Sequence, residues 1–181
     1  MCLRVAACME GDVSDKTVYG EPGVRLMQQV RSERPWLVAM LGRGPADLRS
    51  LLWRVAVTLM IAGGAGCTVA SGVIHLYLWG KQYGYRDVPT IGPLFLLQGI
   101  AAVLIGLLAI VTRRVAALLV AAGLLVASVV ALVLAVEVGL FGFRDSWLAP
   151  YAWTSFYEEV VGGVLLLAAA GVLCFSGKAG R

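Results

Sequence analysis

Apolar positions in this chain gather into long blocks rather than into the stripes of amphipathic helices. Four stretches, at about residues 53–80, 91–112, 115–143 and 157–176, are almost wholly apolar and are separated by short polar segments. Each approaches or exceeds the ~20 residues with which an α-helix crosses a ~30 Å hydrocarbon layer. The pattern predicts an all-α, polytopic membrane protein whose four transmembrane helices form an up-down-up-down bundle.

Composition supports this class. Hydrophobic residues make up 60% of the chain and charged residues 14%, and the mean hydropathy is +0.84, which is too apolar for a soluble domain of 181 residues. The formal net charge of +4 could indicate nucleic acid, but the basic residues are scattered around the apolar stretches instead of forming one patch. We therefore expect the lipid bilayer, and not nucleic acid, as the partner.

Residues 1–50 form a polar leader before the membrane domain of residues 51–181. Glycine and proline interrupt the leader too often for a stable domain, so we expect it to be poorly ordered. No ordered sequence of basic start, apolar run and cleavage site is present, so it should stay attached. Three methionines leave the true translation start open: Met9, Met27 and Met40.

Basic residues near span ends predict the orientation, because Lys and Arg are retained on the cytoplasmic side during insertion. One side has Arg43, Arg49, Arg54, Arg113, Arg114, Lys178 and Arg181, and the other has Lys81, Arg86 and Arg144. Both termini are predicted to be cytoplasmic, in the plasma membrane. Aromatic residues around the 81–90 and 144–156 loops are typical of an interfacial belt on the outer side.

Small residues predict which helix faces touch, since helices in lipid associate through close packing. In the first span Ala62, Gly66 and Ala70 repeat every four residues. In the second span Gly92, Gly99 and Gly106 repeat every seven. The third span is rich in Leu, Val and Ala and could face either lipid or a second subunit, so a homo-oligomer or a larger membrane complex is an open alternative.

Polar residues within the spans are the candidate functional groups, because each is costly there unless it is paired or hydrated. His75 and Glu137 are predicted to lie at similar depth near the outer ends of the first and third spans. Our hypothesis is a hydrated outer cluster of these two residues with Gln98, and with Glu158 or Glu159 at the mouth of the fourth span. A structural His–Glu pair, or two residues that never meet, are the alternatives.

The first outer loop is a second candidate. Trp79, Tyr85 and Arg86 could form a recognition surface for a lipid headgroup, a small solute or a partner protein. The alternative is a rigid hairpin, in which Thr90 caps the second span and Pro93 is tolerated in its first turn.

Familiar membrane chemistries fit the sequence poorly. The chain has one histidine, whereas a cytochrome b type haem needs two axial imidazoles, and its four cysteines include no CxxC pair. Phosphate-binding glycine loops, metal-ligand clusters and nucleophile elbows are also missing from the sequence. We expect no metal, no cofactor and no enzymatic activity.

The stretch from His75 to Trp79, the triplet Gly84–Arg86 and the run from Ile91 to Gln98 carry a resemblance. Together they resemble a pattern in uncharacterised four-helix integral membrane proteins of actinobacteria. The resemblance covers about a fifth of the chain and implies no activity, because none is known for that group.

Three functions remain after these exclusions. The scarcity of chemistry favours an accessory or structural component of a membrane complex. The alternatives are a small-solute or proton-coupled transporter that uses His75 and Glu137, and a lipid- or quinone-binding subunit with His75 and Trp79 beside a helix seam.

Overall fold

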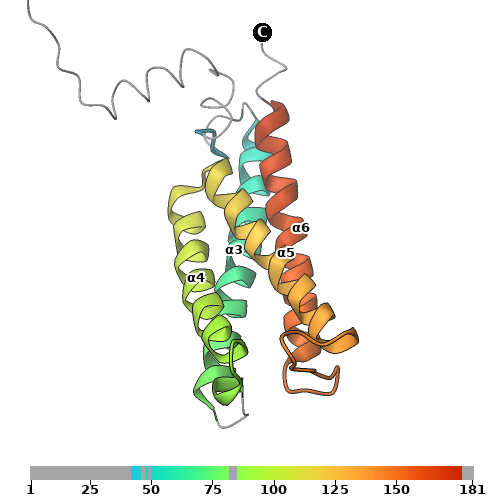
Figure 1. Cartoon of the computed structure of the whole chain (residues 1–181). Coiled ribbons are helices and arrows are strands. Elements are labelled where there is room, and N and C mark those ends of the chain that lie inside the picture. The colour runs from blue at the N-terminus through green and yellow to red at the C-terminus, as the bar shows by residue number, and fades with distance from the viewer. Residues whose placement is uncertain (1–41, 46–47, 49, 82–84, 177–181) are drawn as a thin grey trace, which may run out of the picture. The chain divides into compact units, whose positions relative to one another are not determined.

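The computed structural model describes residues 42–45, 48, 50–81 and 85–176. The predicted leader, with its three candidate start methionines, lies almost entirely outside these residues. The described part contains four α-helices and a short 3-10 helix, arranged as Figure 1 shows: α3 (Leu51–Gly80), η2 (Tyr85–Asp87), α4 (Ile91–Thr112), α5 (Val115–Glu137) and α6 (Ala152–Ser176).

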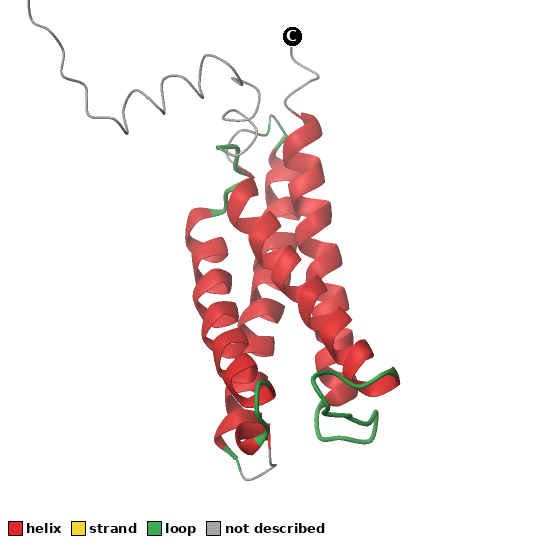
Figure 2. Ribbon diagram, in the orientation of Figure 1, coloured by secondary structure: helices red, strands yellow, loops and turns green. Residues whose placement is uncertain are grey.

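The four α-helices form an antiparallel bundle (Figure 2). Each is long and apolar enough to cross a membrane. The prediction of an all-α, four-helix integral membrane protein is therefore confirmed. We call the end with the α4–α5 turn the Arg113 end, and the end with η2 and residues 138–151 the Tyr85 end.

Two span boundaries differ from the prediction. Helix α5 stops at Glu137 and not near residue 143, because Gly139, Phe141 and Gly142 adopt positive φ angles that an α-helix does not allow. The Arg144 guanidinium donates to the backbone oxygens of Val136 and Glu137, which the helix end leaves unpaired. Helix α6 begins at Ala152, several residues before the predicted position.

Close contact between α3 and α4 depends on glycine. A Cβ atom added to Gly72 would lie 2.8 Å from the backbone oxygen of Gly99, and one added to Gly99 would lie 2.6 Å from Cγ of Leu76. Farther along α4, a Cβ on Gly106 would lie 3.1 Å from the backbone oxygen of Ala65. The two backbones pack so tightly that no larger side chain fits between them.

Helix α3 meets α6 on another face, again through glycine. A Cβ on Gly64 would lie 2.9 Å from the backbone oxygen of Gly162, and one on Gly162 would lie 2.6 Å from Cβ of Cys67. The α3–α4 and α5–α6 hairpins are thus joined mainly through α3 and α6.

The structure contradicts the packing face predicted for α3, whereas the glycines predicted to form the packing face of α4 do make contacts. Ala62, Gly66 and Ala70 are exposed, and a Cβ on Gly66 would meet nothing within 4 Å. A spacing of four identifies a helix face but not its direction, so the α3 contact face lies on other small residues. Gly92, Gly99 and Gly106 on α4 are buried.

Apolar side chains fill the Arg113 end of the bundle. The largest completely buried ones come from α3, α5 and α6: Val57, Ile61, Val115, Leu118, Leu125, Leu166 and Leu173. Toward the Tyr85 end α4 and α5 diverge (Figure 1). The space between them at that end is where polar residues gather.

We expect Gly99→Leu to lower the free energy of unfolding by about 1–3 kcal/mol, because the new side chain would overlap Leu76 and the α3 backbone. Gly66→Leu is the matched control, since open space surrounds Gly66. Unfolding in mixed micelles measures both. Equal losses of stability in the two variants would contradict the packing described.

Candidate binding cavity

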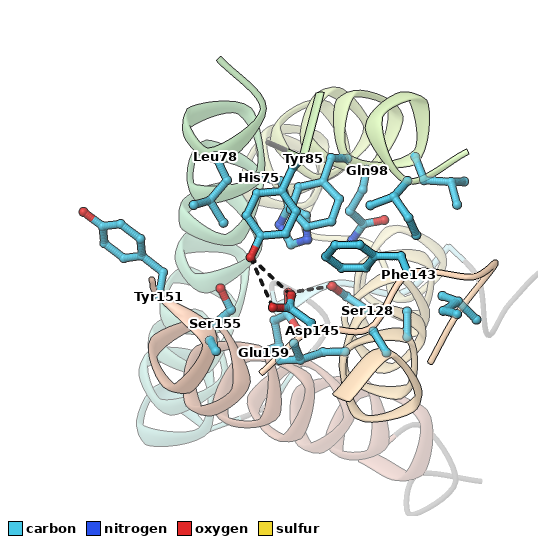
Figure 3. A pocket seen from close by; sticks show the side chains of 18 of the residues that line it. His75, Leu78, Tyr85, Gln98, Ser128, Phe143, Asp145, Tyr151, Ser155 and Glu159 are labelled. Carbon is cyan, nitrogen blue, oxygen red and sulfur yellow. Dashed lines mark hydrogen bonds between the residues drawn. The ribbon is translucent and has the colours of Figure 1, made fainter. Parts of the chain in front are cut away.

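A cavity of about 280 Å³ lies at the Tyr85 end, and all four α-helices, η2 and the 138–151 segment contribute to its wall (Figure 3). Most of the wall is apolar, with side chains such as Leu78, Ile91, Leu94, Leu132 and Leu140. The polar lining residues are His75, Tyr85, Gln98, Ser128, Asp145, Tyr151, Ser155 and Glu159.

Glu159 is the most deeply buried of these, at 1% exposed. Its Oε1 atom accepts hydrogen bonds from the hydroxyl of Ser71 on α3 at 2.8 Å and from the hydroxyl of Ser128 on α5 at 2.6 Å. Both serines are also buried. One carboxyl oxygen therefore links α6 to α3 and α5.

Helix lengths place this contact inside the predicted hydrocarbon layer. Glu159 lies about 10 Å from the start of α6, and Gln98 about 10 Å from the start of α4, at ~1.5 Å per residue. Ser71 and Ser128 lie slightly deeper, about 14 Å from the ends of α3 and α5. The polar groups therefore share a depth well below the loops.

His75 lies one turn from Ser71 on α3. Its Nδ1 atom is 2.8 Å from the backbone oxygen of Ser71, and because a carbonyl oxygen only accepts, Nδ1 carries the hydrogen. The imidazole also packs on the Phe95 ring, with 5.0 Å between centroids, and it interacts electrostatically with Glu159.

Two buried polar atoms at the cavity have no hydrogen-bond partner among the residues that the structure describes: Oε2 of Glu159 and Nε2 of Gln98. A buried polar group without a partner costs about 1–3 kcal/mol, and more when it is charged. Native proteins satisfy nearly all such groups, with water or with ligands where protein atoms are lacking. An acceptor and a donor are thus both unsatisfied at this cavity.

Tyr85 and Asp145 meet at the cavity, in front of Glu159 in Figure 3. The Tyr85 hydroxyl lies 3.2 and 3.4 Å from the Asp145 carboxylate oxygens. The Tyr85 ring stacks on Phe95 at 4.8 Å and meets Phe143 edge-on at 5.8 Å. Burial and the neighbouring carboxylate raise the pKa of the Tyr85 phenol, so it remains a hydrogen-bond donor at physiological pH.

The predicted cluster is only partly brought together. His75, Gln98 and Glu159 line the cavity, whereas Glu137 and Glu158 are not among its lining residues. Glu137 is exposed at the end of α5, where its Oε1 accepts from Nε1 of Trp147 at 3.1 Å. The hypothesis that His75 meets Glu137 is therefore wrong, because α5 ends earlier than predicted and Glu159 lies where Glu137 was expected.

The three residues of the candidate recognition loop lie in two different places. Tyr85 is buried against the cavity, whereas the Arg86 guanidinium lies over the Trp79 ring, 5.0 Å from its centroid. Neither Trp79 nor Arg86 lines the cavity. Arg86 and Trp79 therefore form a separate surface pair, which fits the predicted interfacial belt.

Sequence reasoning missed Ser71, Ser128 and Asp145 as parts of the site. Ser128 is the one hydroxyl in the 115–137 span, and Ser71 lies four residues before His75; these are the signals that could have identified them. Asp145 gives no such signal, because it lies in a loop and reaches the cavity only through the fold.

Comparison with known proteins adds no family or relative: no protein-family model, curated protein or solved structure matches this chain. The resemblance to actinobacterial membrane proteins therefore stays a prediction. Among the described residues, no group of three histidine, cysteine or carboxylate side chains could hold a metal ion.

We expect Ser128→Ala to lower the free energy of unfolding by about 1–3 kcal/mol, because Glu159 loses one of its two donors. In a Glu159→Leu background the same change should cost markedly less, since the acceptor is gone. A double-mutant cycle measures the coupling. A coupling free energy of zero would mean that the Ser128–Glu159 hydrogen bond contributes nothing.

Proposed function

We propose that this integral membrane protein binds a small amphipathic molecule in the cavity at its Tyr85 end. One observation carries the proposal: Glu159, buried in a membrane-spanning helix, lines a cavity of about 280 Å³ and leaves its Oε2 atom without a partner. Sites for small molecules are concave and mostly apolar, with a few polar groups that fix orientation.

The cavity has this composition. Leucine, isoleucine and phenylalanine side chains supply apolar walls, while Glu159, Gln98 and His75 supply polar groups. A wholly apolar ligand would leave Glu159 Oε2 and Gln98 Nε2 without hydrogen-bond partners. A wholly polar ligand would make no favourable contact with the apolar walls. An amphipathic guest suits both parts.

Binding fits the geometry better than transport does. A transporter needs a route past the cavity to the other side, but the Arg113 end is filled by the buried core around Leu118, Leu125 and Leu166. The accessory role favoured by the sequence, and a homo-oligomer, stay predictions, because the exposed apolar faces of the helices suit lipid chains equally well.

The single histidine gives a direct test, since its imidazole resonances report on the cavity alone. The full chain, purified without a histidine tag and labelled with ¹⁵N-histidine, is placed in phosphatidylcholine nanodiscs and titrated separately with decanol and with decylammonium. We expect at least one of these ten-carbon amphiphiles to shift the His75 signals saturably. If neither does, the cavity holds water only and the proposal is wrong.

A matched pair of variants separates binding from partition into the bilayer. Leu132→Trp fills the cavity and should abolish the saturable shift. Leu134→Trp changes an exposed residue of the same type and helix outside the cavity, and it should leave the shift intact. Loss of the shift in both variants, or in neither, would count against binding in the cavity.

We also propose, from the charge bias of the sequence, that the cavity end faces outside the plasma membrane. Two lysines test this: Lys81 follows α3 at the Tyr85 end, and Lys178 follows α6 in sequence. A membrane-impermeant amine reagent on intact cells should modify Lys81 and spare Lys178, as peptide mass spectrometry would report. Modification of Lys178 alone would show that the orientation is the opposite of the one proposed, with the Tyr85 end facing the cytoplasm.

A further inference from the structure

The geometry points to a cationic amphiphile as the guest: an amine or quaternary ammonium group that carries an apolar chain. This inference rests on the proposed binding function and names the chemistry of its ligand. Four features of the cavity support it, namely its charge, the free carboxyl oxygen, its aromatic walls and its exposed side.

The titratable groups around the cavity favour positive charge. Two carboxyl groups line it, Glu159 from α6 and Asp145 from the α5–α6 loop, together with His75 and Tyr85. No lysine or arginine is among these lining residues. The nearest arginine in sequence to Asp145 is Arg144, whose guanidinium is bonded to backbone oxygens at the end of α5.

Glu159 supplies a directed contact. Both serine hydroxyls donate to Oε1, so Oε2 is the oxygen left for a further donor. A carboxylate buried in a membrane span needs an opposite charge or good hydrogen bonds. A protonated amine supplies both, because its N–H can donate to Oε2 while its charge offsets that of the carboxylate, whereas a quaternary ammonium group supplies the charge alone.

Four aromatic side chains line the same cavity as this carboxyl group. The Tyr85 ring packs against Phe95 and against Phe143, and Tyr151 also lines the cavity. Ring faces attract cations, by about 2 kcal/mol or more where water is excluded, and quaternary ammonium groups are commonly held this way. Rings beside a buried carboxylate therefore favour a cationic headgroup over a neutral or anionic one.

The apolar chain has a path between α4 and α5. Leu94 on α4 is 41% exposed, and Ala127 and Ala131 on α5 are also exposed, yet all three line the cavity. These helices diverge at the Tyr85 end (Figure 1). A headgroup can thus reach Glu159 while its chain remains in the hydrocarbon layer.

A neutral alcohol is the strongest competitor, because Gln98 Nε2 is a donor without a partner and a hydroxyl could accept from it. Four probes with the same ten-carbon chain separate the alternatives: decylammonium, decyltrimethylammonium, decanol and decyl sulfate. Each is titrated into the ¹⁵N-histidine-labelled full chain in nanodiscs at pH 7, and the saturation of the His75 signals gives the apparent affinity.

We expect at least one of the two cations to bind on the order of tenfold more tightly than decanol, and decyl sulfate to bind most weakly. Glu159→Gln keeps an oxygen for both serine hydroxyls but removes the charge, so it should erase the preference for cations while decanol still binds. Glu137→Gln, which changes an exposed carboxyl group outside the cavity, should leave the preference intact.

The outcomes distinguish the two proposals. Equal binding of cations and decanol, or a preference that survives Glu159→Gln, would overturn the cationic ligand while leaving amphiphile binding in place. Saturation by none of the four probes would overturn both. If Glu159→Gln fails to fold, the order of affinities in the unaltered protein still decides the charge preference.

Discussion

The carboxyl group of Glu159, shared between two serine hydroxyls, is the interaction that organises the middle of this bundle. It is held by Ser71 from α3 and Ser128 from α5, so a single side chain of α6 links three helices at one depth. A polar contact of this kind helps to hold helices together in a bilayer, where the hydrophobic effect does not drive helix association. It also holds the carboxyl group at the cavity, with its second oxygen unbonded to any described part of the chain.

The backbone contacts of α3 set the shape around that carboxyl group. Glycines bring α3 close to α4 near Gly72 and Gly99, and close to α6 near Gly64 and Gly162. Helices α4 and α5 have no comparable glycine contact among the described residues and separate toward the Tyr85 end. The cavity follows from this unequal packing. Its wall is completed by Tyr85 and Asp145, which come from segments outside the four α-helices.

The candidate site could be predicted only in part, for reasons that particular residues make clear. The cost of burying polar groups singled out His75, Gln98 and Glu159 as residues to examine, and all three line the cavity. It also placed Glu137 at the centre of the cluster beside His75, because residues 138–143 are as apolar as the span before them. Hydropathy does not register the positive φ angles that end α5, so Glu137 was predicted at a depth it does not have.

The sequence by itself determined that this is a membrane protein, how many helices span the membrane and roughly which residues each span contains. These properties depend on the length and polarity of continuous segments of the chain. Only the tertiary structure decided which carboxyl group is buried and which small residues touch. A shift of one residue turns a helical side chain by about 100°, and a helix that ends a turn or two early moves a residue from the hydrocarbon to the surface. Hydropathy records neither the direction in which a side chain points nor the residue at which a helix ends, and contacts between segments far apart in the chain set both.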